Sequence, residues 1–296
     1  MPMPALSLVA MPGRRLKTLE LATEMETRGF QGIFGPSFGD VLSLCLSVGH
    51  VTERIPFGSA IQPIYLRPAA DLAATASYLA EVSGGRFHLG LGVSHGPMHE
   101  RLGVQVGKPL ADTREYVETI KAVIGDAPRP PIVLATLRSK MLQLAREIAD
   151  GAVWANGSRR YLPDQLRAAG VPDGFFVGNM VPTVVDDDRN AARAVNRKTL
   201  TGYVALPNYR NYWKEAGYVE EMEGIERALE AGDRDAVARY MTDEWLDDCT
   251  LSGSATQVRD GVEAWFDAGA TMPIVVPSST SGGQLKAIEE IFAAYA

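Results

Sequence analysis

The stretch Phe87-His-Leu-Gly-Leu-Gly-Val-Ser-His-Gly96 joins an apolar run to a loop of small and polar residues. The apolar positions of 87–93 predict a buried strand. The three glycines resemble the fingerprint of a dinucleotide-binding loop, but in that fingerprint the third glycine comes one residue earlier and opens a helix. The sequence predicts no helix directly after Gly96, so this stretch argues against a Rossmann unit.

Short apolar runs alternate with longer stretches of helical periodicity on both sides of this segment. The strands predicted from these runs are residues 6–11, 30–34, 56–61, 87–93, 131–135, 152–155, 175–185 and 273–276. Strands that alternate with helices predict a parallel sheet. Eight such units are typical of a (β/α)8 TIM barrel, and a doubly wound sheet is the alternative.

The stretch 187–267 is almost wholly helical in pattern and much longer than one crossover needs. It predicts a helical insertion after strand seven, with breaks near Gly217, Gly232 and Gly253. The sequence has no internal repeat and no Pro-rich or Ser-rich linker. We therefore expect a single domain over residues 1–296.

The composition limits the possible partners and locations. The 296 residues carry a net charge of −7, whereas nucleic-acid binders normally show a basic patch. Cys45 and Cys249 are too few for a disulfide framework. The N-terminal residues lack the basic stretch of a signal peptide, and no apolar run approaches the length of a membrane span. We expect a cytoplasmic protein that binds neither nucleic acid nor a membrane.

Active sites of TIM barrels are built from loops at the C-terminal ends of the strands. In this sequence those loops are residues 35–38, 60–63, 92–96, 136–139 and 156–158. They are rich in glycine and hydroxyl groups, which let backbone N–H groups approach an anion. They predict a pocket for a phosphorylated ligand, in which Gly92, Gly96 and Gly157 face the ligand. Because no pair of His or Cys residues has zinc-like spacing, we expect no metal site.

The segment Gly85-Arg-Phe-His-Leu-Gly-Leu-Gly-Val-Ser-His-Gly96 resembles the strand-four signature of the bacterial luciferase-like monooxygenase family. Residues 55–63, 145–151 and 251–258 resemble the same family and follow its order. The resemblance implies a barrel with a late insertion, a homodimer, and a reaction that depends on FMN or on the deazaflavin coenzyme F420. It also implies that the cofactor lies at the C-terminal end of the barrel.

The resemblance carries over to particular positions. It implies a non-prolyl cis peptide at Ala60-Ile61, behind the flavin ring. It places 92–96 along the ribityl chain and phosphate, and 136–139 on the phosphate side. The residues expected to bind the cofactor are Ala60, Ile61, Gln62, Gly92, Val93, Ser94, His95, Gly96, Ala135, Thr136, Leu137, Ser139 and Asn156.

His95, just past strand four, is the candidate catalytic histidine, and a loop histidine bonded to backbone is the alternative. Many deazaflavin-dependent relatives have a histidine after strand two, whereas this chain has Pro36-Ser37-Phe38. The usual proton donor is therefore absent or replaced, and Ser37 is the candidate at that place. The aromatic residues at 203, 209, 212 and 213 are either a satellite core, a dimer contact, or a lid over the substrate.

These observations predict a luciferase-like oxidoreductase that uses reduced F420 for hydride transfer to a small organic substrate. An FMN-dependent monooxygenase is the alternative within the family. A non-catalytic flavin-binding protein and a barrel that acts on phosphorylated metabolites without a flavin are alternatives from other classes.

Overall fold

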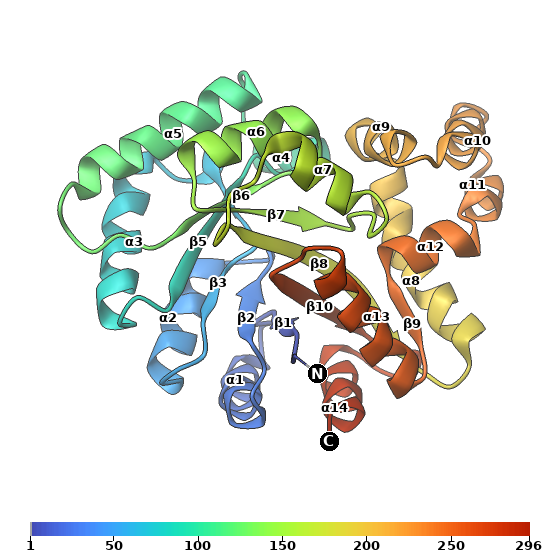
Figure 1. Ribbon diagram of the computed structural model, residues 1–296, viewed down its shortest axis with the longest axis horizontal. Coiled ribbons are helices and arrows are strands. Elements are labelled where there is room, and N and C mark those ends of the chain that lie inside the picture. Colours follow the sequence, from blue (N-terminus) through green and yellow to red (C-terminus); the bar gives the residue numbers. More distant parts are fainter. Residues whose placement is uncertain (1) are drawn as a thin grey trace. The chain divides into compact units, whose positions relative to one another are not determined.

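The computed structural model (Figure 1) describes residues 2–296, with Leu102 by its backbone alone. The chain divides into two compact units. The first unit comprises residues 2–154 and 169–178. The second unit comprises residues 155–168 and 179–296. The expectation of a single domain over residues 1–296 stays a prediction. No helix within residues 2–296 is long and apolar enough to cross a membrane.

The first unit is a parallel sheet whose strands follow one another in chain order. The neighbours are β1-β2-β3-β5-β6-β7, and β4 also pairs with β5. A doubly wound sheet would reverse its strand order partway, and this order does not. The strands are β1 (Ala5–Ser7), β2 (Gly32–Gly35), β3 (Phe57–Ser59), β4 (Gln62–Pro63), β5 (Phe87–Gly92), β6 (Ile132–Ala135) and β7 (Gly151–Ala155).

A helix follows most of these strands, as the periodicity predicts. The helices are α1 (Arg15–Arg28), α2 (Val41–Val51), the 3-10 turn η1 (Ile64–Leu66), α3 (Ala69–Val82), α4 (Gly96–Leu102), α5 (Pro109–Ile124) and α6 (Ser139–Ile148). The expectation that no helix opens directly after Gly96 is wrong, because α4 begins there. Its seven residues have a proline in the first turn, and they are followed by Gly103, whose φ is 64°. They are too few and too polar to show helical periodicity.

The second unit contains the helical insertion. The elements that lie mostly or wholly in it are α7 (Leu162–Ala169), β8 (Phe176–Val185), α8 (Arg189–Val204), α9 (Pro207–Glu215), α10 (Val219–Glu230), α11 (Arg234–Tyr240), α12 (Asp243–Cys249), β9 (Leu251–Gly253), α13 (Ala255–Asp267), β10 (Met272–Ser278) and α14 (Gln284–Ala294). The prediction that 187–267 is almost wholly helical missed β9, which pairs with β8 in parallel. A strand of three residues is too short to show an alternating pattern.

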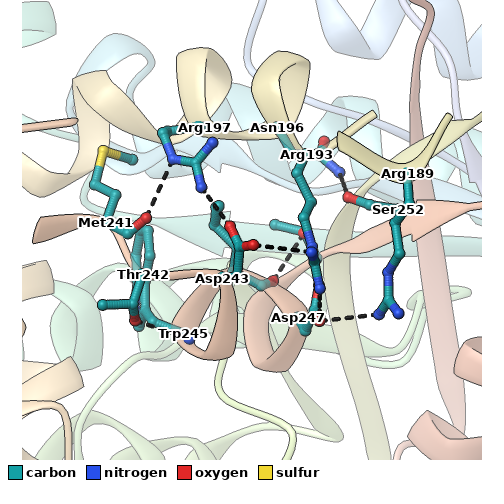
Figure 2. A network of polar contacts seen from close by, with 12 residues as sticks. Arg189, Arg193, Asn196, Arg197, Met241, Thr242, Asp243, Trp245, Asp247 and Ser252 are labelled. Carbon is teal, nitrogen blue, oxygen red and sulfur yellow. Dashed lines mark hydrogen bonds and ion pairs between the residues drawn. The ribbon is translucent and has the colours of Figure 1, made fainter. Parts of the chain in front are cut away.

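Charged side chains hold α12 against α8 (Figure 2). Arg193 contacts Asp243 at 2.8 Å and Asp247 at 2.6 Å, and Arg197 contacts Asp243 at 2.7 Å. The Arg193 side chain is only 16% exposed, so solvent screens its ion pairs less than those of a surface pair. Next to them, Asn196 of α8 donates to the carbonyl of Leu251 in β9 at 3.0 Å. The start of the insertion is thereby tied to its end.

Arg86, directly before β5, donates hydrogen bonds to several neighbouring backbone carbonyls. Its guanidinium donates to the carbonyls of Ser83, Ile55, Gly49 and Thr52, and to the Thr52 hydroxyl, at 2.9–3.2 Å. It also lies 5.2 Å from the centre of the Phe57 ring. One side chain thus satisfies the backbone at the end of α2 and fixes that end to β3 and β5.

Glu26 satisfies the backbone of the same turn from α1. Its carboxylate accepts hydrogen bonds from the N–H groups of Glu53, Arg54 and Ile55 at 2.6–3.1 Å. Burial disfavours the charged form, but the three N–H donors outweigh burial and lower the pKa of Glu26. Glu26 therefore stabilises the fold in its charged form.

We expect Glu26→Gln to lower the free energy of unfolding at pH 7 by about 1–2 kcal/mol, because glutamine replaces a charged acceptor with a neutral one. The native pKa lies below the unfolded one, so the contribution is complete above the unfolded pKa and is lost as the pH falls through the native pKa. Urea denaturation from pH 7 down to about pH 3 measures it. A difference between the two proteins that is independent of pH would contradict this assignment.

Candidate functional site

The C-terminal ends of β2, β3, β5 and β6 meet along one edge of the sheet in the first unit, because these strands are parallel neighbours. This edge brings together most of the residues that the sequence assigns to a site. Ser37 follows β2, residues 60–62 follow β3, residues 92–96 follow β5, and residues 135–139 follow β6. The prediction that these loops converge is therefore supported within the first unit.

Close packing of β3 against β5 shapes this edge. A Cβ at Gly90 would lie 1.9 Å from the carbonyl oxygen of Ser59, and a Cβ at Gly92 would lie 2.7 Å from the Cβ of Ala135. The Ser59 hydroxyl donates to the Gly90 carbonyl at 2.8 Å and accepts from its N–H at 3.0 Å. The Ala60-Ile61 peptide, directly after β3, is cis, as predicted.

The glycines of this segment therefore have different physical roles. Gly90 and Gly92 are required by protein packing, so the sequence argument that Gly92 is small in order to admit a ligand is not needed. A Cβ at Gly96 would have no atom within 4 Å, and this glycine is exposed. Whether Gly92 and Gly96 contact a cofactor stays a prediction.

The loop between β5 and α4 has an unusual backbone. Ser94 has a φ of 63°, a left-handed conformation that is uncommon for residues other than glycine. The next residue, His95, has extended backbone, and its carbonyl accepts the N–H groups of Met98 and His99 at 3.0 and 3.1 Å. Non-glycine residues in this conformation often cluster at functional sites. The loop is therefore a candidate ligand-binding segment on geometric grounds.

His95 is neutral at pH 7. Burial lowers its pKa, and the nearby His99 lowers it further, because a second positive charge there is unfavourable. His99 in turn contacts the Val93 carbonyl through Nε2 and lies edge-on to the Tyr65 ring. The Tyr65 hydroxyl donates to Asp112 at 2.7 Å. The ring contact and these hydrogen bonds connect the His95 loop to η1 and α5.

The sequence did not predict this tether, by which His99 and Tyr65 connect the His95 loop to Asp112, because Tyr65 and Asp112 are far from residue 95 in the chain. A local signal exists for His99, which follows His95 by four residues in the sequence.

Thr136 supplies a buried polar atom with no protein partner. Its backbone N–H donates to the Val153 carbonyl at 2.9 Å, and its side chain is 5% exposed. Its hydroxyl forms no hydrogen bond within residues 2–296. Buried hydroxyls are nearly always paired, so this one suits an acceptor of a ligand. Its neighbours Ala135 and Leu137 are half-buried, and Ser139 is exposed at the start of α6.

The remaining residues at this edge differ in accessibility. Ala60 and Gln62 are buried, Ile61 and Val93 are half-buried, and the Gln62 amide donates to the Pro63 carbonyl at 3.2 Å. Ser37 is half-buried, whereas the adjacent Phe38 is 65% exposed. Ser37 is therefore accessible enough to contact a ligand but is not fixed by any hydrogen bond described for it.

Asn156 lies in the second unit, directly after β7. Its φ is 58°, and its side chain is 3% exposed. Its backbone N–H donates to the Met180 carbonyl at 3.0 Å, and its carbonyl accepts from the Trp213 indole at 3.3 Å. Its side chain lies against the Tyr203 hydroxyl, whose pKa is raised by burial and lowered by a hydrogen bond with Asn156. Asn156 is therefore held by contacts within the second unit.

The aromatic residues of the insertion form a packed cluster around the same loop. Tyr209, Tyr212 and Trp213 are at most 4% exposed. The Trp213 ring contacts those of Tyr209 and Trp245, with centroids 5.4 and 4.8 Å apart, and the Tyr212 ring contacts that of Tyr161. This supports the satellite-core interpretation over a mobile lid.

Comparisons with known proteins agree with this architecture. A coenzyme F420-dependent oxidoreductase assigned in Mycobacterium tuberculosis is 26% identical, over 88% of this chain and 90% of the relative. The 5,10-methylenetetrahydromethanopterin reductase of Archaeoglobus fulgidus is 29% identical, over 85% of each chain.

Among solved structures, the coenzyme F420-dependent tetrahydromethanopterin reductase from Methanopyrus kandleri matches with a TM-score of 0.75 and 18% identity, over all of both chains. This likeness shows the fold class, a (β/α)8 TIM barrel with a helical insertion after its seventh strand. The model of the luciferase-like monooxygenase family matches residues 10–272. The family resemblance of the sequence is thus confirmed, and this chain belongs to the luciferase-like monooxygenase family.

Proposed function

We propose that the protein is an oxidoreductase that uses reduced coenzyme F420 for hydride transfer to a small organic substrate. The observation that carries the proposal is the C-terminal edge of β2–β6. It combines a left-handed Ser94, a neutral His95 and an unpaired, buried Thr136 hydroxyl. The curated relatives, one of them F420-dependent by name, support this cofactor over FMN.

The residues at this edge fit a flavin-like ligand. The Thr136 hydroxyl is free to donate to an oxygen of the ligand, which removes the penalty of an unpaired buried group. The half-buried side chains of Ile61, Val93 and Leu137 supply apolar surface for a ring system. Gly96 leaves open space beside the loop. The cofactor-binding residues of the first unit therefore stay as the sequence predicts them, and the assignment of Asn156 stays a prediction from the sequence.

When bound, the reduced cofactor supplies the hydride, and the protein supplies binding, orientation and exclusion of water. A neutral His95 can accept a proton through one ring nitrogen and donate through the other. We propose that it holds a proton at the ligand, and that Ser37 is the hydroxyl at the place where relatives have a histidine. We also propose that the chain forms a single domain and that the protein is a cytoplasmic homodimer. Analytical sedimentation would measure the mass of the dimer.

Titration of the purified protein with F420 and with FMN tests the function, followed by absorbance and fluorescence. We expect saturable binding of F420 at one site per chain and weaker binding of FMN. Binding of neither cofactor would overturn the proposal. Preferential binding of FMN would favour the monooxygenase alternative, and F420 binding without turnover of any substrate in a broad panel would favour a storage protein.

We expect His95→Ala to weaken F420 binding about tenfold, because it removes a half-buried hydrogen-bonding group worth about 1.4 kcal/mol. The midpoint of thermal unfolding should change little, since His95 lies in a loop. His50→Ala is the matched control, because His50 is exposed at the end of α2. A large loss of stability with normal affinity would make His95 a structural residue instead.

A further inference from the structure

The segment 93–95, between β5 and α4, has a backbone that needs support. Ser94 has a φ of 63°, whereas residues that carry a Cβ favour negative φ, so its left-handed conformation costs free energy. Such a conformation persists only where the surrounding structure holds it. Ser94 is half-buried at the candidate site, and the residues that hold it all belong to the first unit.

His99 of α4 holds the backbone on both sides of Ser94. Its side-chain Nε2 contacts the Val93 carbonyl, and its backbone N–H donates to the His95 carbonyl at 3.1 Å. Because a carbonyl oxygen can only accept, the Nε2 atom carries a hydrogen and donates it. One residue thereby fixes a carbonyl group on each side of the left-handed residue.

The His99 side chain is itself held by Tyr65 of η1. The two rings are perpendicular, and their centroids are 5.7 Å apart. They can meet because β4 and β5 are paired strands, so η1 and the segment 93–99 leave the sheet as neighbours. Both side chains are half-buried. The contact therefore restricts the directions in which the His99 ring can turn away from the Val93 carbonyl.

Asp112 of α5 fixes Tyr65 in turn. The Tyr65 hydroxyl donates to the Asp112 carboxylate at 2.7 Å. Burial raises the pKa of Tyr65, and the adjacent carboxylate raises it further, so the hydroxyl keeps its proton and remains the donor. The support for Ser94 thus runs from α5 through Tyr65 to His99, across three segments of the first unit.

We propose that His99 is a positioning residue for the cofactor, which holds Ser94 in its left-handed conformation and so fixes the backbone that carries His95. Tyr65 and Asp112 act through His99. This inference rests on the proposed function and extends it, because it gives three residues outside the predicted binding set a role in cofactor affinity. A purely structural contact would stabilise the fold without changing affinity, whereas a contact that preorganises a binding loop strengthens binding.

Tyr65→Phe against Tyr116→Phe tests the proposal. Tyr116 of α5 is also half-buried, and its hydroxyl donates to the Arg67 carbonyl at 2.8 Å. Each substitution removes one hydroxyl and its hydrogen bond, and only the first releases the ring that holds His99. We expect F420 to bind Tyr65→Phe about fivefold more weakly than the wild type, and Tyr116→Phe within about twofold of it. Equal affinities of the two variants would overturn the proposal.

Three substitutions of His99 separate positioning from general loosening of α4. His99→Gln places an amide N–H near the position of the imidazole Nε2, His99→Asn has the same amide one methylene shorter, and His99→Ala has no donor. We expect alanine and asparagine to weaken F420 binding about five- to tenfold, and glutamine to restore it to within about threefold of the wild type. Glutamine and asparagine variants of equal affinity would overturn the proposal, because the N–H to the Val93 carbonyl would then not matter.

Thermal unfolding of every variant is recorded alongside the F420 titration, so that a loss of affinity is read only from folded protein. If His99→Ala does not fold, the glutamine and asparagine variants supply the comparison. A wild-type protein that binds F420 no better than its Tyr65 and His99 variants would overturn this inference alone. A wild-type protein that binds no F420 would overturn the proposed function, and this inference with it.

Discussion

Replacing Gly90 by alanine is expected to lower the free energy of unfolding by about 3 kcal/mol or more, the upper part of the range for overpacked cores. The added methyl group would lie 1.9 Å from the Ser59 carbonyl oxygen, and backbone cannot rotate away as a side chain can. The separation of β3 and β5 would have to increase. This would break the paired hydrogen bonds between Ser59 and Gly90, at 2.8 and 3.0 Å.

Urea denaturation followed by circular dichroism measures this loss, together with the yield of soluble protein. Gly96→Ala is the control within the same segment, because a Cβ there meets no atom within 4 Å. It should change stability by no more than about 1 kcal/mol, and in the stabilising direction if α4 gains helix propensity. If the Gly90 variant were as stable as the Gly96 variant, the packing of β3 against β5 described above would be wrong.

Arg86→Ala is the second substitution with a large expected effect, a loss of about 3 kcal/mol in the free energy of unfolding. The guanidinium satisfies carbonyl groups of Gly49, Thr52 and Ile55 at once. Its removal leaves these acceptors without their partner, and unpaired buried acceptors cost more than the bonds themselves contribute. The contact with the Phe57 ring is lost as well.

Arg86→Lys distinguishes geometry from charge in this contact. Lysine keeps the charge but has no planar fork that reaches several carbonyls, so it should recover only a minor part of the loss. Arg28→Ala is the control, because Arg28 forms an exposed pair with Glu24 and contributes at most about 0.5 kcal/mol. Full recovery by lysine in thermal and urea denaturation would contradict the geometric explanation.

The periodic elements were predictable because their signals are local. Helix α3 spans Ala69–Val82, where buried residues recur at helical spacing, and α1 ends at Arg28 before Gly29, whose φ is 83°. Short elements were not predictable. The strand β4 has two residues and β9 has three, and neither length can show a period.

Some parts of the candidate site could likewise be predicted from the sequence, and others could not. The loops at the strand ends could be predicted, because parallel strands place their C-terminal ends on one edge. The prediction that 92–96 forms a ligand loop rests on residue types, and the left-handed Ser94 adds geometric support. The tether of His99 and Tyr65 to Asp112 could not be predicted, since its members come from three separate segments.

The sequence by itself determined the alternation of strands and helices, the late insertion and the family motifs, because each of these depends on residues close together in the chain. Only the tertiary structure decided what the glycines accommodate and what holds Asn156. Gly90 is small because of Ser59, 31 residues earlier, and Asn156 is fixed by Trp213, 57 residues later. Such contacts depend on the path of the whole chain, which local periodicity does not encode.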